Sequence, residues 1–112
     1  MALSKLADPA AVAPLVQLIK DSHWSVREAA IRALGVFRDA SAVAPLAEAL
    51  KDSDREVREA TVRTLMEIGD PAAIEFLVPV LKDDQDSVRA VAITALRRLD
   101  SQWEHSAAAK RA

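Results

Sequence analysis

Aspartate and arginine recur along this chain at a fixed interval, and they are its first candidates for chemistry. Three aspartates stand 31 residues apart, and an arginine follows each by six positions: Asp21, Asp52 and Asp83, with Arg27, Arg58 and Arg89. A guanidinium group can bind a carboxylate through two parallel hydrogen bonds. These residues are therefore candidates either for a ladder of internal ion pairs or for a row of ligand-binding arginines.

The same interval appears in the residues around these charges. Lys20-Asp21 leads to Val26-Arg27, and the same four residue types recur at Lys51-Asp52 with Val57-Arg58 and at Lys82-Asp83 with Val88-Arg89. A period of this size is typical of proteins built from stacked structural repeats. Apolar residues make up 51% of the chain and there are only 2 glycines, so helical spacing of Ala, Leu and Val predicts an all-α protein.

The period organises the 112 residues into one repeat domain over residues 1–99. We expect residues 1–6 to be the stub of a preceding repeat, with repeats at 7–37, 38–68 and 69–99 and a C-terminal cap or tail at 100–112. Because the first residues align with the end of repeat one, we interpret the chain as a piece of a longer array. The alternative is a natural protein whose first repeat has shrunk.

Each repeat is predicted to hold a short helix A and a longer helix B, joined by the Lys-Asp turn. Asp8-Pro9 and Asp70-Pro71 are typical helix starts, because Asp caps free N–H groups and Pro fits the first helical position. Asp54 is the expected cap of the second helix B. Gly69 is the expected left-handed residue at its end.

Apolar residues at helical spacing mark the side of each helix that should be buried. For helices A these are Val12, Leu15, Leu18, Ile19, Val43, Leu46, Ala49, Leu50, Ile74, Leu77, Val80 and Leu81. For helices B they are Val26, Ala29, Ala30, Ala33, Leu34, Phe37, Val57, Thr61, Val62, Leu65, Ile68, Val88, Val91, Ala92, Ile93, Ala95, Leu96 and Leu99. Pro14, Pro45 and Pro79 should bend helices A, with the strongest distortion at Pro79.

The short helix A, the Lys-Asp turn and the Val-Arg-x-x-Ala/Thr-x-x-x-Leu pattern of helix B resemble HEAT-like repeats. The most similar form is the short-period repeat of phycobilin lyase subunits, and the resemblance covers residues 2–99. It implies a right-handed α-solenoid, or superhelix, of three antiparallel helix pairs, with helices A on the convex side and helices B on the concave side. It also implies that the Asp and Arg rows form a structural ladder between neighbouring repeats.

The resemblance places the exposed stripe of helices B on the concave face, where a partner would bind. The residues of this stripe that we select as partner-binding candidates are Trp24, Glu28, Arg32, Arg55, Glu59, Arg63, Glu67, Thr94 and Arg98. Arg and Trp are common anchors of protein interfaces. The alternative is a solvated face whose charges neutralise each other at i, i+4 spacing. Trp24 would then cover the N-terminal end of the stack.

The sequence offers no pattern for catalysis, metal binding or a cofactor. There is no cysteine, and the two histidines, His23 and His105, are 82 residues apart. No His-Glu pair occurs at the repeat spacing, so the di-iron hydroxylase made of HEAT-like repeats is excluded as a guide to its chemistry. Basic residues are interleaved with acidic ones at a net charge of −2, which disfavours nucleic-acid binding.

We therefore expect a non-catalytic scaffold that binds a protein partner through the concave helix B face. The alternatives are an accessory subunit or fragment of a phycobilin lyase-like complex, and a purely structural fragment of a longer HEAT array. Self-association through uncapped ends is also expected, because Val12, Val16 and Ile31 should be open. No membrane span or secretory signal is seen, so a cytoplasmic location is the expectation.

Overall fold

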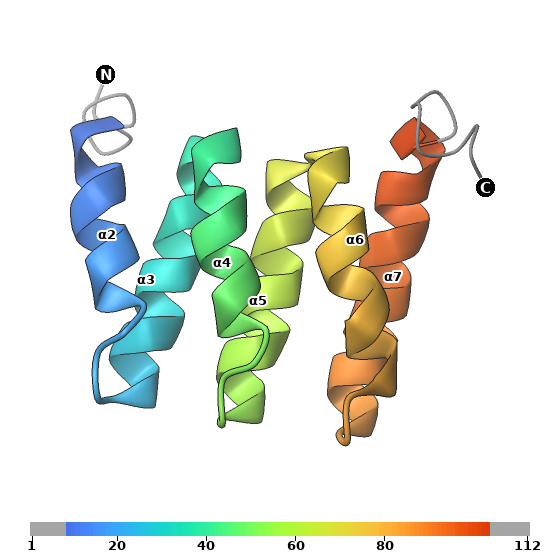
Figure 1. Ribbon diagram of the computed structural model, residues 1–112. Coiled ribbons are helices and arrows are strands. Elements are labelled where there is room, and N and C mark those ends of the chain that lie inside the picture. The colour runs from blue at the N-terminus through green and yellow to red at the C-terminus, as the bar shows by residue number, and fades with distance from the viewer. Residues whose placement is uncertain (1–8, 104–112) are drawn as a thin grey trace.

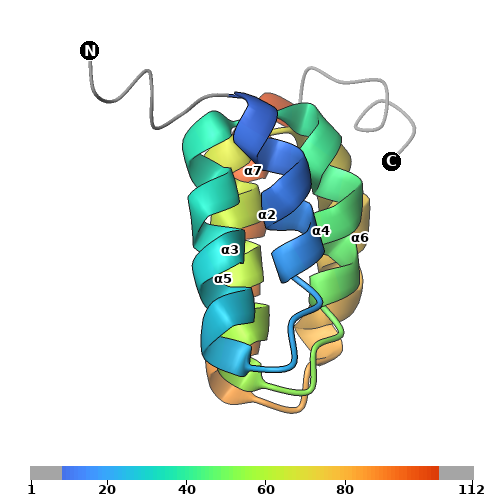
Figure 2. The ribbon, with the colours of Figure 1, turned by 90° about the vertical axis from the view of Figure 1, so that its left-hand side faces the viewer.

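The computed structural model describes the backbone of residues 9–103 and the side chains of residues 10–100. This part of the chain is all-α, with short 3-10 helices and no strand. Its six α-helices pack as three pairs in two layers (Figures 1 and 2). One layer holds α2 (Val12–Leu18), α4 (Val43–Ala49) and α6 (Ile74–Leu77), and the other holds α3 (Trp24–Phe37), α5 (Arg55–Ile68) and α7 (Asp86–Trp103).

The shorter helix of each pair begins with a 3-10 turn rather than with an α-helical turn. These turns are η1 (Pro9–Ala11), η2 (Ala40–Ala42) and η3 (Pro71–Ala73). Asp70 Oδ1 accepts a hydrogen bond from Ala72 N at 2.9 Å, and Asp39 Oδ1 accepts one from Ser41 N at 2.9 Å. The prediction that Asp70-Pro71 starts a helix is therefore confirmed, whereas Asp8 lies outside the described residues.

The three prolines act differently because they lie at different depths in their helices. Pro14 and Pro45 are the third residues of α2 and α4, in the first turn, where a backbone N–H has no partner within the α-helix. Each helix is seven residues long in all and continues past its proline. Pro79 lies one turn deeper, and α6 gives way there to the 3-10 helix η4 (Val78–Lys82).

Two of the longer helices, α3 and α5, end where the chain adopts a left-handed conformation. Gly69 has φ 75° and its N–H bonds to Leu65 O at 3.1 Å, as predicted for the end of α5. Arg38 ends α3 at the equivalent position with φ 50°, which the sequence did not indicate. Asp54 caps α5 by accepting from Glu56 N at 3.0 Å. In α7 the equivalent of Arg38 and Gly69 is Asp100, and the helix continues through it to Trp103.

The core runs through all three pairs, and the predicted apolar positions fill most of it. The largest fully buried apolar side chains are Ile31, Leu34, Leu46, Leu65, Leu77, Leu99, Val57, Val62 and Val88. Four predicted core positions are wrong, because Leu18, Ala29, Leu81 and Ile93 are exposed. The expectation that Ile31 is open is also wrong, since α5 packs on α3 and leaves Ile31 fully buried.

Substitutions at the two left-handed positions test how these helices end. Gly69→Ala should lower the free energy of unfolding by about 1–2 kcal/mol, because a Cβ is unfavourable in this conformation. Arg38→Gly should raise it by about 1 kcal/mol or less, since glycine also costs chain entropy. Urea unfolding followed by circular dichroism measures both. Effects of the same sign would show that left-handed geometry does not limit stability at these positions.

Candidate functional site

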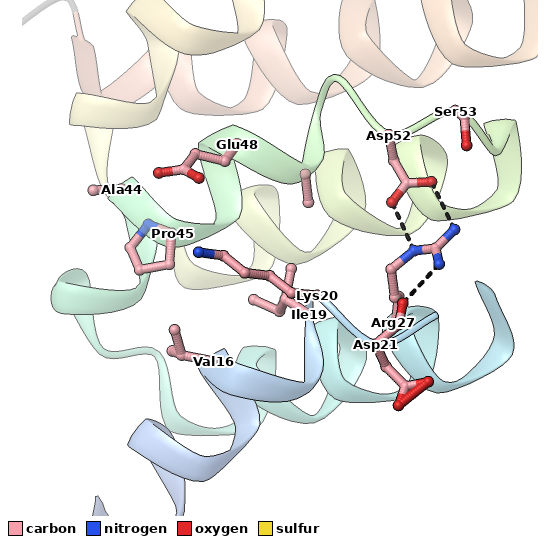
Figure 3. Close-up of a pocket in the computed structure, with 11 residues that line it drawn as sticks. Val16, Ile19, Lys20, Asp21, Arg27, Ala44, Pro45, Glu48, Asp52 and Ser53 are labelled. Atoms are coloured by element: carbon pink, nitrogen blue, oxygen red, sulfur yellow. Dashed lines mark hydrogen bonds and ion pairs between the residues drawn. The ribbon is translucent and has the colours of Figure 1, made fainter. Parts of the chain in front are cut away.

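The predicted Asp and Arg rows meet between neighbouring helix pairs. Arg27 on α3 donates from Nε to Asp52 Oδ2 at 2.8 Å and from Nη2 to Asp52 Oδ1 at 3.1 Å. Its third nitrogen, Nη1, donates to the backbone oxygen of Asp21 at 2.8 Å (Figure 3). The side chains of Arg27 and Asp52 are 15% and 11% exposed. This contact therefore links the turn of one pair to the turn of the next through a shielded, two-pronged ion pair.

The same contact is repeated one helix pair further along. Arg58 donates to Asp83 Oδ2 at 2.8 Å, to Asp83 Oδ1 at 3.1 Å and to the backbone oxygen of Asp52 at 2.7 Å. Asp52 and Asp83 also accept backbone N–H groups two residues on, from Asp54 at 2.9 Å and Gln85 at 3.0 Å. These arginines and aspartates are fully engaged with the protein itself, which suits a structural ladder better than a ligand site.

The hydrogen bonds around Asp83 lower the pKa of its carboxyl group. Burial by itself raises the pKa of the Asp83 carboxyl group. Hydrogen bonds from Arg58 and from the backbone N–H of Gln85 outweigh burial, and the pKa of Asp83 lies below its ordinary value of 3.8. The ionised form is therefore the one that the folded chain stabilises.

Asp21 and Arg89, the first and last predicted members of the ladder, do not form a rung within the described residues. Asp21 Oδ1 accepts from His23 N at 3.0 Å, and the Asp21 side chain is 31% exposed. Arg89 keeps the bond to the backbone oxygen of its own turn, at Asp83. Its Nη2 pairs with Asp86 on the same helix, whose side chain is 94% exposed.

Four of the predicted partner-binding residues on α3 and α5 form two local ion pairs in which the arginine faces solvent. Arg32 Nη2 lies 3.1 Å from Glu28 Oε2, with side chains 66% and 21% exposed. Arg63 Nη1 lies 3.8 Å from Glu59 Oε1, with side chains 56% and 19% exposed. The charges thus neutralise each other formally, but the glutamates are shielded and the guanidinium groups are presented outward.

A hollow of about 560 Å³ lies between α3 and α5 beside these arginines. Its lining residues are Arg32, Gly35, Val36, Arg38, Ala60, Arg63, Thr64 and Glu67. A Cβ on Gly35 would lie 2.7 Å from Glu67 Oε1, so glycine leaves the room that the Glu67 side chain occupies. The hollow brings together three of the predicted candidates, Arg32, Arg63 and Glu67, on two helices.

The other candidates lie elsewhere on the same layer. Trp24, 45% exposed, begins α3, and Arg55 begins α5, where it bonds Gln85 Oε1 at 3.3 Å. Thr94 and Arg98 are exposed on α7, away from the lining of the hollow. Sequence reasoning missed Gly35, Val36 and Arg38 as lining residues. The sequence does contain one indication of this hollow: Gly35 occupies the position that carries the large side chains of Met66 and Arg97 in the other two repeats.

The opposite layer has two further hollows. One, of about 820 Å³, lies between α4 and the α6–η4 segment and includes Phe76, which is 38% exposed. The other, of about 550 Å³, lies between α2 and α4 beside the Arg27–Asp52 rung (Figure 3). Within the described residues, no group of three or more His, Cys, Asp or Glu side chains could hold a metal ion. None of the helices in residues 9–103 is long and apolar enough to cross a membrane.

Comparison with known proteins agrees with this architecture. A family model described as HEAT repeats matches residues 1–50 and residues 12–97. The structure of human deoxyhypusine hydroxylase in complex with glycerol is similar, with 29% sequence identity and a TM-score of 0.79. The similarity covers 93% of this chain but 38% of the hydroxylase, so the chain spans well under half of that protein. No curated protein sequence matches the chain.

Removing one arginine of the ladder should expose its energetic role. Arg58→Ala leaves the shielded Asp83 carboxylate without its partner, and we expect a loss of roughly 3 kcal/mol in the free energy of unfolding. Arg89→Ala is the matched control, because its carboxylate partner is exposed, and should cost about 1 kcal/mol. Chemical unfolding measures both. Equal losses would contradict the idea that the rung between pairs supplies the difference.

The lowered pKa of Asp83 predicts acid sensitivity with a definite sign. Because the folded-state pKa is depressed, the stabilisation is present above the unfolded pKa of about 4 and is lost as the pH falls through the folded pKa. Asp83→Asn keeps an acceptor for Gln85 N but removes the charge. The variant should therefore be less stable than the parent at pH 7 and converge with it in strong acid. A constant difference across unfolding curves from pH 7 to pH 2 would contradict this.

Proposed function

Because the chain belongs to the HEAT repeat family, we propose that it is a non-catalytic scaffold that binds a protein partner across its α3–α5–α7 layer. HEAT repeats are generally protein-interaction scaffolds, and such repeats present long exposed surfaces built from successive helices. The choice of this layer, and of a partner with acidic side chains, is our inference from the side chains that it presents.

The main support for the proposal is the hollow that is lined by Gly35 and by the outward-facing Arg32 and Arg63. Arg32 and Arg63 are more than half exposed, while the glutamates that pair with them are about four-fifths shielded. A guanidinium group can pair with Glu through one edge and still offer other N–H donors to a second carboxylate. Val36, 63% exposed on the rim, supplies an apolar contact beside these charges.

This arrangement differs from a face on which charges simply neutralise each other. Such a face would expose the Arg and Glu of each pair alike, whereas in the Arg32–Glu28 and Arg63–Glu59 pairs the arginine projects and the glutamate is shielded. Glu67 is the exposed acidic residue of the hollow. Arg and Trp are enriched at interfaces, and Trp24 is exposed at the start of α3. The hollow between α4 and α6 is larger and contains exposed Phe76, so it is the competing location for a partner.

The similarity to deoxyhypusine hydroxylase raises the possibility of catalysis, and we propose that this chain has none. The proposal is supported by its chemistry: the sequence contains two histidines and no cysteine, and the described residues hold no metal-binding cluster. A shared fold does not transfer an activity, because activity depends on the residues of a site. The phycobilin lyase-like role stays a prediction of the sequence.

Site-specific photocrosslinking can decide which layer meets a partner. A photoreactive phenylalanine replaces Val36 on the α3–α5–α7 layer or Phe76 on the opposite layer, both of which are exposed apolar positions. In an extract of the source cells, we expect a discrete crosslinked protein from position 36 and none from position 76. Crosslinks from position 76 alone would move the interface to the other layer. An absence of crosslinks from both would support a purely structural fragment.

Charge reversal then tests the chemistry of the contact. In the position-36 variant, Arg63→Glu should weaken capture of the crosslinked protein by about thirtyfold, the effect of an interface anchor. Lys51→Glu is the matched control, because this exposed lysine lies on the opposite hollow and carries the same change in charge. Trp24→Ala shows whether the interface reaches the start of α3. Equal capture by the Arg63 and Lys51 variants would contradict recognition by the arginines.

A further inference from the structure

The end of the described stack at α6 and α7 exposes apolar positions that the inner pairs bury. Ile93 is 42% exposed, whereas its equivalents one and two repeats earlier, Val62 and Ile31, are 0% exposed. Leu81 is 39% exposed, whereas its equivalents Leu50 and Ile19 are each 7% exposed. These positions therefore face the following helix pair, and at this end no following pair exists within residues 9–103.

The opposite end shows the complementary pattern. Leu18 on α2 is 42% exposed, whereas its equivalents Ala49 and Val80 are 5% and 7% exposed. Ala29 on α3 is exposed, while its equivalent Ala60 on α5 is 3% exposed. These positions face the preceding pair. The two ends thus carry the two halves of the apolar interface that joins successive pairs inside the stack.

The two ends also carry the two halves of an arginine–aspartate rung. Each inner rung joins an arginine of one pair to an aspartate of the next, as Arg27 joins Asp52 and Arg58 joins Asp83. Among the described residues, the last arginine, Arg89, pairs with the exposed Asp86 of its own helix and donates to the carbonyl of its own turn at Asp83. The first aspartate, Asp21, is 31% exposed, against 11% and 10% for the aspartates of the inner rungs.

We propose that copies of this chain stack head to tail, with the α6–α7 end of one against the α2–α3 end of the next. Arg89 of one copy then binds Asp21 of its neighbour as a further rung, and Ile93 and Leu81 cover Leu18 and Ala29. The start of α2 and the end of α7 lie at the same edge of the stack, as the links between inner pairs require (Figure 1). The partner is a second copy because one chain supplies both the charge and the apolar surface that the other end needs.

The contact is heterologous, since it uses different surfaces on the two copies. Such contacts extend into open assemblies when they do not close into a ring. The stack leaves the α3–α5–α7 layer exposed and lengthens it, so assembly and the proposed binding function do not compete. Exchange of the exposed Arg89–Asp86 pair for a shielded rung costs little, because exposed ion pairs are weak.

Sedimentation velocity and equilibrium of the full chain, from about 5 µM to about 1 mM, test the proposal. We expect the weight-average mass to rise with concentration beyond that of a dimer. Asp21→Asn, which preserves an acceptor for the His23 N–H, should lower the association constant about tenfold or more. Ile93→Glu should abolish association, whereas Ala44→Glu, at an exposed position on α4 of the middle pair, should not.

A charge exchange distinguishes head-to-tail stacking from dimers that join two like ends, and a mass beyond that of a dimer excludes closed dimers. Asp21→Arg alone and Arg89→Asp alone should each abolish association, and an equimolar mixture should restore it, because each junction then pairs opposite charges. Glu48→Arg and Lys51→Glu, exposed on the middle pair, are controls with matched charge changes and should associate like the parent. Circular dichroism confirms that each variant is folded.

Two results would overturn the proposal. The first is a chain that stays monomeric throughout the concentration range, which would mean that no second copy covers the ends. The second is a mixture of the two charge-reversed variants that associates no better than each alone. A dimer that survives Asp21→Arg but not Arg89→Asp would also overturn it, because that result places two α6–α7 ends together.

Discussion

The two-pronged contact between an arginine and the aspartate of the next turn is the interaction on which this structure depends. Arg27 and Arg58 each use one nitrogen for a carbonyl of their own turn and two for the following carboxylate. Because the guanidinium fork is planar, it fixes direction as well as distance. Apolar burial drives the pairs together without preferring one register. The arginine–aspartate contacts therefore set how each helix pair is oriented on the next.

Most residues that join the helix pairs are therefore different from the residues that we propose to contact a partner. The ladder and the core make the main contacts between pairs, and Arg55 and Glu59 on α5 add hydrogen bonds to Gln85 and Ser87 of the next pair. Other projecting side chains, such as Arg32 and Arg63, pair within their own helix. Gly35 shows how a single residue can change the shape of the α3–α5 surface. The missing Cβ makes room for Glu67 and leaves a hollow between two helices that are otherwise closely packed. The same scaffold can therefore present different sites when only the projecting residues change.

The comparison with deoxyhypusine hydroxylase follows from that separation. A chain can share 29% of its residues and nearly its whole fold with part of an enzyme because the repeated core positions impose the helix pairs. Chemistry requires particular side chains to converge at one place. In the described part of this chain, Arg32, Arg63 and Glu67 line one hollow, which we propose as the contact site for another protein.

The sequence by itself determined the helix pairs, the Asp54 cap, the left-handed Gly69, most of the core and which residues could form a ladder. These features depend on local conformation and on a period of 31 residues, both of which are visible along the chain. Only the tertiary structure decided that Arg38 adopts φ 50°, that Ile31 is buried and that Ile93 is exposed. Ile31 and Ile93 are the same residue type at equivalent positions, and they differ only in whether another helix pair follows. Burial, the outward direction of the arginines and the hollow beside Gly35 arise from contacts between neighbouring repeats, which the spacing of residues within one repeat does not specify.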